Sequence, residues 1–162
     1  MKKLAIQKSN ISHELTTYFL NKDVDVCEFL TIDDIDTDLF DLIVMDDYES
    51  ELPRNSINIH PSLLPAFAQK DAIEKAFMYG VKISGITISN NNNIIAQYPV
   101  FISTDMHFDE FKQEIMKAKL QLSKIIIEDM LANRAIDYDY SRKIMNNNQC
   151  NCSNCKGCHN LF

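Results

Sequence analysis

Glycine is scarce in this sequence, because its 162 residues include only Gly80, Gly85 and Gly157. Phosphate-binding loops of the G-x-G-x-x-G or Walker type need several glycines close together, since the backbone must approach the phosphate. No part of the sequence brings three glycines together. Nucleotide binding through either kind of loop is therefore excluded.

Long apolar runs and an excess of positive charge are also lacking. No stretch approaches the ~18 apolar residues of a membrane-spanning helix, and the apolar run near the basic start covers only Leu4–Ile6. The formal net charge is −7, whereas nucleic acids are bound by clustered Lys and Arg. With 46% apolar and 24% charged residues, the composition is typical of one globular domain. We therefore expect a cytoplasmic protein that has neither a membrane nor a nucleic acid as its partner.

The apolar pattern alternates between the periods of strands and helices. Strand-like patterns occupy residues 4–6, 24–29, 39–45, 56–60 and 81–83, and helical spacing occupies residues 11–19, 72–79 and 106–133. Ser9 and Asn10 are the cap candidates of the first helix, and Gly80 closes the second. The β-branched segments 85–88 and 94–102 flank an asparagine-rich turn and predict a hairpin.

This order of elements predicts an α/β fold, with an open, mostly parallel sheet, flanking helices and a late antiparallel hairpin at one edge. After Lys143 the composition changes to an asparagine- and cysteine-rich stretch that has almost no apolar residues before Leu161. We therefore expect an α/β domain over residues 1–143 and a separate tail over residues 144–162.

Two polar side chains share a face at the end of the strand predicted for residues 56–60. Period-two geometry places Ile57 and Ile59 on one face of this strand, and Asn58 and His60 on the other. Ligands of open α/β sheets bind at the carboxyl ends of the strands. An amide next to an imidazole at that place is suited to stabilising an oxyanion and moving a proton. By spacing alone, a solvated strand end is the more common explanation of this pattern.

The wider segment narrows these alternatives. It reads Asn58-Ile59-His60-Pro61-Ser62-Leu63-Leu64-Pro65-Ala66-Phe67 and closely resembles the signature of the folate-dependent formyltransferases. Residues 71–76, 80–88 and 94–100 look like the segments that follow this signature in the phosphoribosylglycinamide formyltransferases, and the long helix resembles the family's penultimate helix. The resemblance covers residues 56–135, strongly in the first half and by pattern in the second.

The resemblance implies transfer of a formyl group from 10-formyltetrahydrofolate, the cosubstrate, to an amine such as glycinamide ribonucleotide, a step of purine biosynthesis. Asn58 would bind the folate through its formyl oxygen and stabilise the oxyanion, and His60 would transfer the proton. The family also has a catalytic Asp on a loop between the hairpin strands. Residues 89–93 are Ser89 and four asparagines, so that carboxylate is missing, and proton transfer should suffer.

Two further segments depart from the family. Its glycine-containing phosphate loop after the first strand is replaced by residues 8–12, where Ser9, Asn10 and Ser12 remain as donors for an anion. The middle section is short and acidic, with Asp46, Asp47, Glu49 and Glu51, and we expect these carboxylates to form a solvated turn.

Four of the five cysteines lie in the last thirteen residues, as Cys150, Cys152, Cys155 and Cys158. Four thiolates are a reasonable ligand set for Zn²⁺ or an iron–sulfur cluster, and the spacing does not separate these metals. A reduced flexible tail and a disulfide formed on oxidation are the alternatives. Cys27, on the second strand, is expected to be a small buried apolar residue.

Two hypotheses follow from the sequence. The first is a small relative of the phosphoribosylglycinamide formyltransferases that uses Asn58 and His60 for formyl transfer or for hydrolysis at the formyl carbon. The second is a catalytically inactive domain of the same fold that binds folate or a protein partner, with the cysteine tail as a metal or redox sensor. The short asparagine turn favours the second hypothesis.

Overall fold

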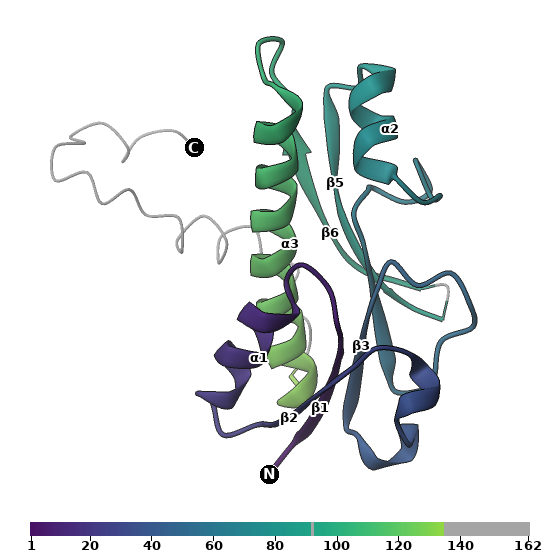
Figure 1. Ribbon diagram of the computed structural model, residues 1–162, viewed down its shortest axis with the longest axis vertical. Coiled ribbons are helices and arrows are strands. Elements are labelled where there is room, and N and C mark those ends of the chain that lie inside the picture. Colours follow the sequence, from purple (N-terminus) through teal and green to yellow (C-terminus); the bar gives the residue numbers. More distant parts are fainter. Residues whose placement is uncertain (92, 135–162) are drawn as a thin grey trace, which may run out of the picture.

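The computed structural model describes residues 1–91 and 93–134. The strands of this part are β1 (Lys3–Gln7), β2 (Asp25–Phe29), β3 (Leu42–Asp46), β4 (Ser56–His60), β5 (Ile83–Asn90) and β6 (Asn93–Phe101). The helices are α1 (Ser12–Leu20), α2 (Ala72–Tyr79) and α3 (Phe108–Leu131), with 3₁₀ turns η1 (Ile32–Asp34) and η2 (Thr37–Leu39). Figure 1 shows α3 running along most of the length of the molecule.

The strands form one six-stranded sheet in the order β2-β1-β3-β4-β5-β6. The pairs among β2, β1, β3 and β4 are parallel, and β5 and β6 are antiparallel to their neighbours. This topology confirms the prediction of a mostly parallel sheet with a late antiparallel hairpin at one edge. Its main consequence is that β3 and β4 end side by side at the same edge.

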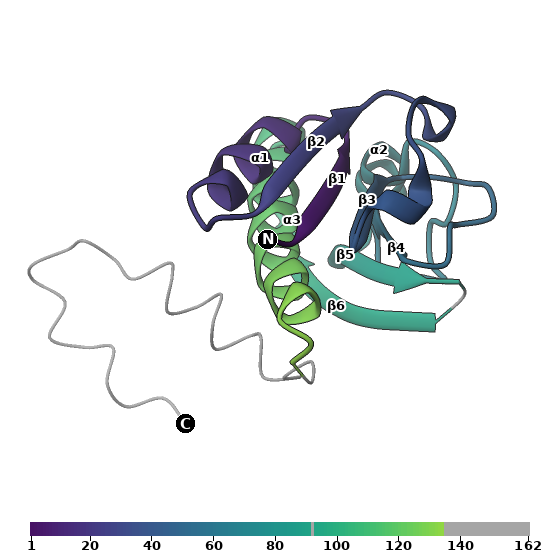
Figure 2. The same cartoon turned by 90° about the horizontal axis from the view of Figure 1, so that it is seen from below.

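One face of the sheet is covered by α1 and α3, which lie on the same side of it in Figure 2. Ile57 and Ile59 of β4 point into this core, as strand alternation requires. The long helix is held by apolar residues at spacings of three and four: Phe111, Ile115, Ala118, Leu122 and Ile126 are all buried. The α2 helix packs near the start of α3, where the Phe77 ring lies 5.3 Å from the ring of Phe108.

The other face carries a smaller core that connecting segments cover. Its buried members are Ala5, Phe29, Ile43 and Met45, and its partly buried neighbours are Ile32, Ile35, Phe40, Tyr48 and Leu52. Those neighbours lie in the two segments that lead into and out of β3. Asn58 and His60 alternate with Ile57 and Ile59 along β4, so their side chains point to this second face and away from α3.

Three local predictions are wrong. The N-cap of α1 is Ile11, not Ser9 or Asn10 as predicted, and Ile11 makes no side-chain cap hydrogen bond. Residues 81–83 are no separate strand, because Ile83 is already the first residue of the long hairpin strand β5. Cys27 is exposed, because it lies on the edge strand β2 and faces the side that the helices leave uncovered. Gly80 is the left-handed C-cap of α2, as predicted.

Residues 144–162, with Cys150, Cys152, Cys155 and Cys158, and the boundary at residue 143 lie outside the described residues. Within the described part, no group of three His, Cys, Asp or Glu side chains is placed to hold a metal ion. No described helix has the length and hydropathy to span a membrane.

Candidate functional site

The site lies at the carboxyl edge of β3 and β4. The parallel register places Met45 beside Asn58 and Asp46 beside Ile59, so the residue after Asp46 falls next to His60. Asn58 is half-buried, and His60 is buried with 5% of its surface exposed. The structure therefore brings the two predicted side chains together on one face, as strand alternation indicated.

Asn58 fixes the segment that follows β3. Its Nδ2 donates to the carbonyl of Tyr48 at 2.9 Å, and its Oδ1 accepts from the backbone N–H of Tyr48 at 3.0 Å. An amide nitrogen carries two N–H groups, and this pairing uses one of them. The second N–H is the one that Asn58 can offer to a bound molecule.

His60 is held through both ring nitrogens. Nδ1 lies 2.6 Å from Oδ1 of Asp47, and Nε2 lies 2.9 Å from the carbonyl oxygen of Phe67. A carbonyl oxygen only accepts, and an ionised carboxylate only accepts, so both nitrogens donate together in the imidazolium form. This geometry favours a positively charged His60.

The pKa values of the pair move in the directions that an ion pair requires. Burial lowers the pKa of His60, but the hydrogen bonds to Asp47 and to the Phe67 carbonyl outweigh burial and hold this pKa above its ordinary value. The hydrogen bond from His60 holds the pKa of Asp47 below its ordinary value, against the opposing effect of partial burial. Lys119 is near enough to lower both pKa values by its charge.

The acidic residues at the end of β3 and just after it do not all form the solvated turn that the sequence indicated. Asp46 forms an ion pair with Lys119 of α3, and these side chains are only 10% and 4% exposed. The backbone N–H of Asp46 also donates to Oε1 of Gln7 at 3.0 Å. Asp47 turns the other way, to His60, from a left-handed backbone with φ of 54°. The prediction holds only for Glu49 and Glu51, which are exposed.

The connector after His60 is tied down on the hairpin. Oγ1 of Thr87 in β5 donates to the carbonyl of Ser62 at 2.7 Å and accepts from the backbone N–H of Leu64 at 3.0 Å. Gly85 lies under the same connector, because a Cβ there would meet the carbonyl of Tyr98 at 2.1 Å and the side chain of Leu63 at 2.8 Å. The hairpin and the connector are thus fitted to each other around the site.

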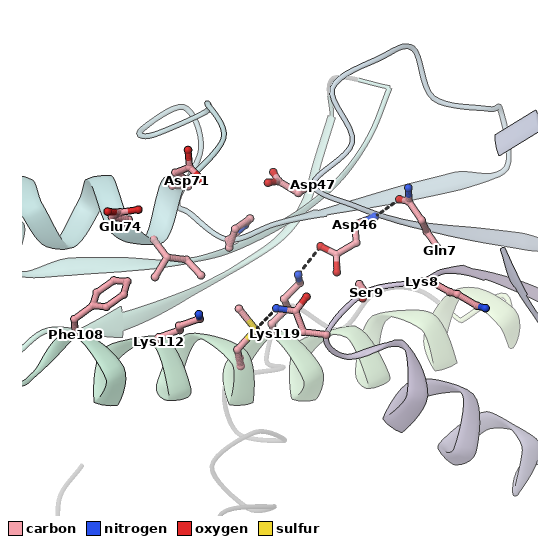
Figure 3. Close-up of a pocket in the computed structure, with 15 residues that line it drawn as sticks. Gln7, Lys8, Ser9, Asp46, Asp47, Asp71, Glu74, Phe108, Lys112 and Lys119 are labelled. Atoms are coloured by element: carbon pink, nitrogen blue, oxygen red, sulfur yellow. Dashed lines mark hydrogen bonds and ion pairs between the residues drawn. The ribbon is translucent and has the colours of Figure 1, made fainter. Parts of the chain in front are cut away.

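The first cavity has a volume of about 490 Å³ and opens between β1, β3, α2 and α3. Three lysines reach it, Lys8 from the segment before α1, and Lys112 and Lys119 from α3. Figure 3 shows Lys119 directed from α3 toward Asp46, with Asp47 on the same rim and Asp71 at the start of α2. Ser9 and Asn10, predicted as donors for an anion, line this cavity. The third predicted donor, Ser12, is buried and donates to the carbonyl of Ser9.

The second cavity has a volume of about 770 Å³ and lies between the segment after β3 and the hairpin. Asn58 is one of its walls, together with Leu64 and Pro65 of the connector and Ser89 and Ile94 of the hairpin. Its walls combine apolar side chains, such as Leu52 and Ala68, with polar ones, which include the carboxylates of Glu49 and Glu51. Asn58 thus faces one cavity while Asp47 faces the other.

Asp47 is the site residue that the sequence analysis missed. A signal for it was present, because two carboxylates directly follow a dense apolar strand that neighbours the Asn58 strand in the predicted order. Side chains at the carboxyl ends of adjacent parallel strands meet at one edge. The sequence could therefore have placed Asp46 and Asp47 near His60, but only the register decides which of them contacts the imidazole.

Comparison with known proteins shows which family this chain resembles. A family model described as formyl transferase matches residues 18–121. The phosphoribosylglycinamide formyltransferase of Bacillus subtilis is 38% identical over 81 residues, which are 46% of this chain and 42% of that protein. A formyltetrahydrofolate deformylase of Haemophilus influenzae is 30% identical over 93 residues, or 56% of this chain and 32% of that protein. The chain spans less than half the length of these curated relatives.

Solved structures show the same fold. Phosphoribosylglycinamide formyltransferase from Streptococcus pneumoniae superposes with a TM-score of 0.58 at 21% identity, covering 80% of this chain and 99% of that chain. A formyltetrahydrofolate deformylase from Pseudomonas syringae superposes with a TM-score of 0.64 at 16% identity, covering 85% of this chain and 64% of that chain. Since the family model spans well over half of the sequence, this chain belongs to the formyl transferase family.

Proposed function

We propose that this protein transfers the formyl group of 10-formyltetrahydrofolate to an amine, with glycinamide ribonucleotide as the first acceptor to test. The observation that carries the proposal is the position of Asn58 and His60 at the carboxyl edge of the sheet. Asn58 lines one cavity there, and Asp47, the hydrogen-bond partner of His60, lines the other. A transfer between two molecules needs a donor site and an acceptor site that meet at the reacting groups. The relatives named above act on such a pair of molecules or on formyltetrahydrofolate alone.

The chemistry of the walls assigns the two cavities. The first cavity is assigned to an anionic acceptor such as a sugar phosphate, because three lysines line it. They are Lys8, Lys112 and Lys119, and they lie beside the carboxylates of Asp46, Asp47, Asp71 and Glu74. The cavity beside Asn58 combines apolar side chains, such as Leu52, Leu64 and Ile94, with polar side chains of the segment after β3 and of the hairpin. This mixture suits a flat, hydrogen-bonding ring system such as a pterin. The donor and the acceptor would then approach Asn58 and His60 from opposite sides.

In the proposed reaction the acceptor nitrogen attacks the formyl carbon, and the formyl oxygen gains negative charge. The free N–H of Asn58 stabilises this oxyanion, and the imidazolium of His60 supplies a proton. The intermediate collapses when the bond between the formyl carbon and N10 breaks; N10 receives a proton and the acceptor nitrogen loses one. Nε2 of His60 is hydrogen-bonded to the carbonyl of Phe67. During the reaction this hydrogen bond must be replaced by one to the substrate.

Hydrolysis at the same carbon is the second candidate, since the matched deformylase acts on formyltetrahydrofolate. Water then takes the place of the amine, and the products are formate and tetrahydrofolate. The residues that stabilise the oxyanion and supply the proton are the same. The two candidates differ only in what occupies the lysine-lined cavity.

The test is to measure tetrahydrofolate release from 10-formyltetrahydrofolate with and without glycinamide ribonucleotide, for the wild-type protein, Asn58→Ala and His60→Ala. We expect each variant to lose ~10²-fold or more of the rate, because oxyanion donors and general acids contribute at that level. Release only in the presence of the ribonucleotide supports transfer, and release without it supports hydrolysis. Wild-type rates equal to those of both variants would overturn the proposal.

A further inference from the structure

We infer that Asp47 is the positioning carboxylate of His60, supplied by the end of β3 in place of the carboxylate that the hairpin lacks. The inference rests on the proposed function for its catalytic meaning. Asp47 follows β3, which pairs with one side of β4, whereas the hairpin strand β5 pairs with the other side.

The backbone fixes Asp47 for this contact. Its N–H continues the ladder between β3 and β4 by donating to the carbonyl of Ile59 at 2.9 Å. Its φ of 54° is left-handed, a conformation that Asp tolerates better than most residues and that turns the chain away from the strand. The side chain then reaches back to Nδ1 of His60 at 2.6 Å, within the range of a charge-assisted hydrogen bond.

The contact sets the protonation state of the imidazole. With Nδ1 donating to Asp47, the proton on Nε2 points to the Phe67 carbonyl, which occupies the place that a substrate oxygen or nitrogen would take. The pKa directions of both groups agree with a charged pair. Asp47 is 31% exposed at its side chain and lines the first cavity, so the pair is connected to the acceptor side.

The surrounding charges do not reverse this conclusion. The charged groups around the pair are Asp46 at the end of β3, Lys112 and Lys119 on α3, Asp71 and Glu74 at the start of α2, and Lys70 before it. Lys119 disfavours a second positive charge on His60, but its own closest partner is Asp46. Asp47 is therefore the carboxylate that acts on His60 directly.

The test uses Asp47→Asn and Asp47→Glu in the full-length protein. Asp23→Asn is the matched control, because Asp23 also has a left-handed φ, of 60°, and lies just before β2 at the amino end of the sheet. The pKa of His60 is read from its Cε1–H resonance by NMR titration, with the resonance assigned by its loss in His60→Gln. The pH dependence of kcat is measured on the same proteins.

In Asp47→Asn we expect the pKa of His60 to fall by about one unit or more, since a neighbouring opposite charge shifts a pKa by that amount. The rate should fall by ~10²-fold, as for loss of a general acid, and its alkaline limb should move with the pKa of His60. Asp47→Glu should recover part of both effects, and Asp23→Asn should change neither.

An unchanged pKa of His60 in Asp47→Asn would overturn the inference whatever the rates. A lowered pKa together with a wild-type rate would overturn the catalytic meaning of the contact. If the wild-type protein releases no tetrahydrofolate, the proposed function fails, while the titration still decides whether Asp47 controls His60.

Discussion

Replacing Lys119 by methionine should be among the most destabilising single changes in this domain. The Lys119 side chain is 4% exposed, and its ammonium group neutralises Asp46, whose side chain is 10% exposed. The other carboxylate oxygen of Asp46, Oδ2, is buried and has no hydrogen-bond partner among the described residues. Without Lys119, a nearly buried carboxylate would have no cation in contact.

The expected cost follows from that arrangement. Removing one partner of a buried ion pair costs about 3–5 kcal/mol, because the remaining charge stays desolvated. With an m value of about 2 kcal/mol/M in urea, a loss of about 4 kcal/mol lowers the unfolding midpoint by about 2 M. The measurement is urea unfolding followed by circular dichroism at neutral pH. The control is Lys117→Met, since Lys117 is exposed on the same helix, and it should change the free energy of unfolding by less than about 0.5 kcal/mol.

A double variant separates the charge from the packing. Asp46→Asn with Lys119→Met removes both charges, so it should be more stable than Lys119→Met alone, with a coupling energy of about 1 kcal/mol or more. A cost below about 1 kcal/mol for Lys119→Met would refute the reasoning, because surface ion pairs reach that value. A double variant no more stable than Lys119→Met would refute it as well.

Two more predictions concern the ion pair of His60 and the packing of the hairpin. Folding raises the pKa of His60, so its contribution to the free energy of unfolding is complete below the pKa of the unfolded state and is lost as the pH rises through the folded pKa. Folding lowers the pKa of Asp47, so its contribution is present above the pKa of the unfolded state and is lost as the pH falls through the folded pKa. The difference in unfolding free energy between wild type and Asp47→Asn should therefore be largest between about pH 4 and 6.5, and a constant difference across urea titrations from acid to alkaline pH would contradict the ion pair. Gly85→Ala should cost at least about 2 kcal/mol in the same assay, because its Cβ would lie 2.1 Å from the Tyr98 carbonyl. The neighbouring Ser84→Ala is the control and should be neutral or stabilising, because Oγ of Ser84 is buried without a hydrogen-bond partner in the described part. Equal losses of unfolding free energy in the two variants would argue against a clash at Gly85.

The contacts that sequence reasoning missed are those between distant segments. Asp47 and His60 are 13 positions apart, and their contact depends on how β3 and β4 align. Asp46 and Lys119 are 73 positions apart, and no local pattern connects the end of a strand with the middle of a helix. Cys27 was misjudged for the same reason, because the sequence does not tell an edge strand from a central one.

The sequence by itself determined the order of strands and helices, the shared face of Asn58 and His60, and the resemblance that pointed to formyl transfer. These features depend on local periodicity and on a short contiguous motif, which need no knowledge of distant contacts. The tertiary structure decided which carboxylate reaches His60, because strand register and the turn after β3 direct Asp46 to α3 and Asp47 to the imidazole. The missing hairpin carboxylate therefore does not leave His60 without an acidic partner, since the packing of two parallel strands supplies one.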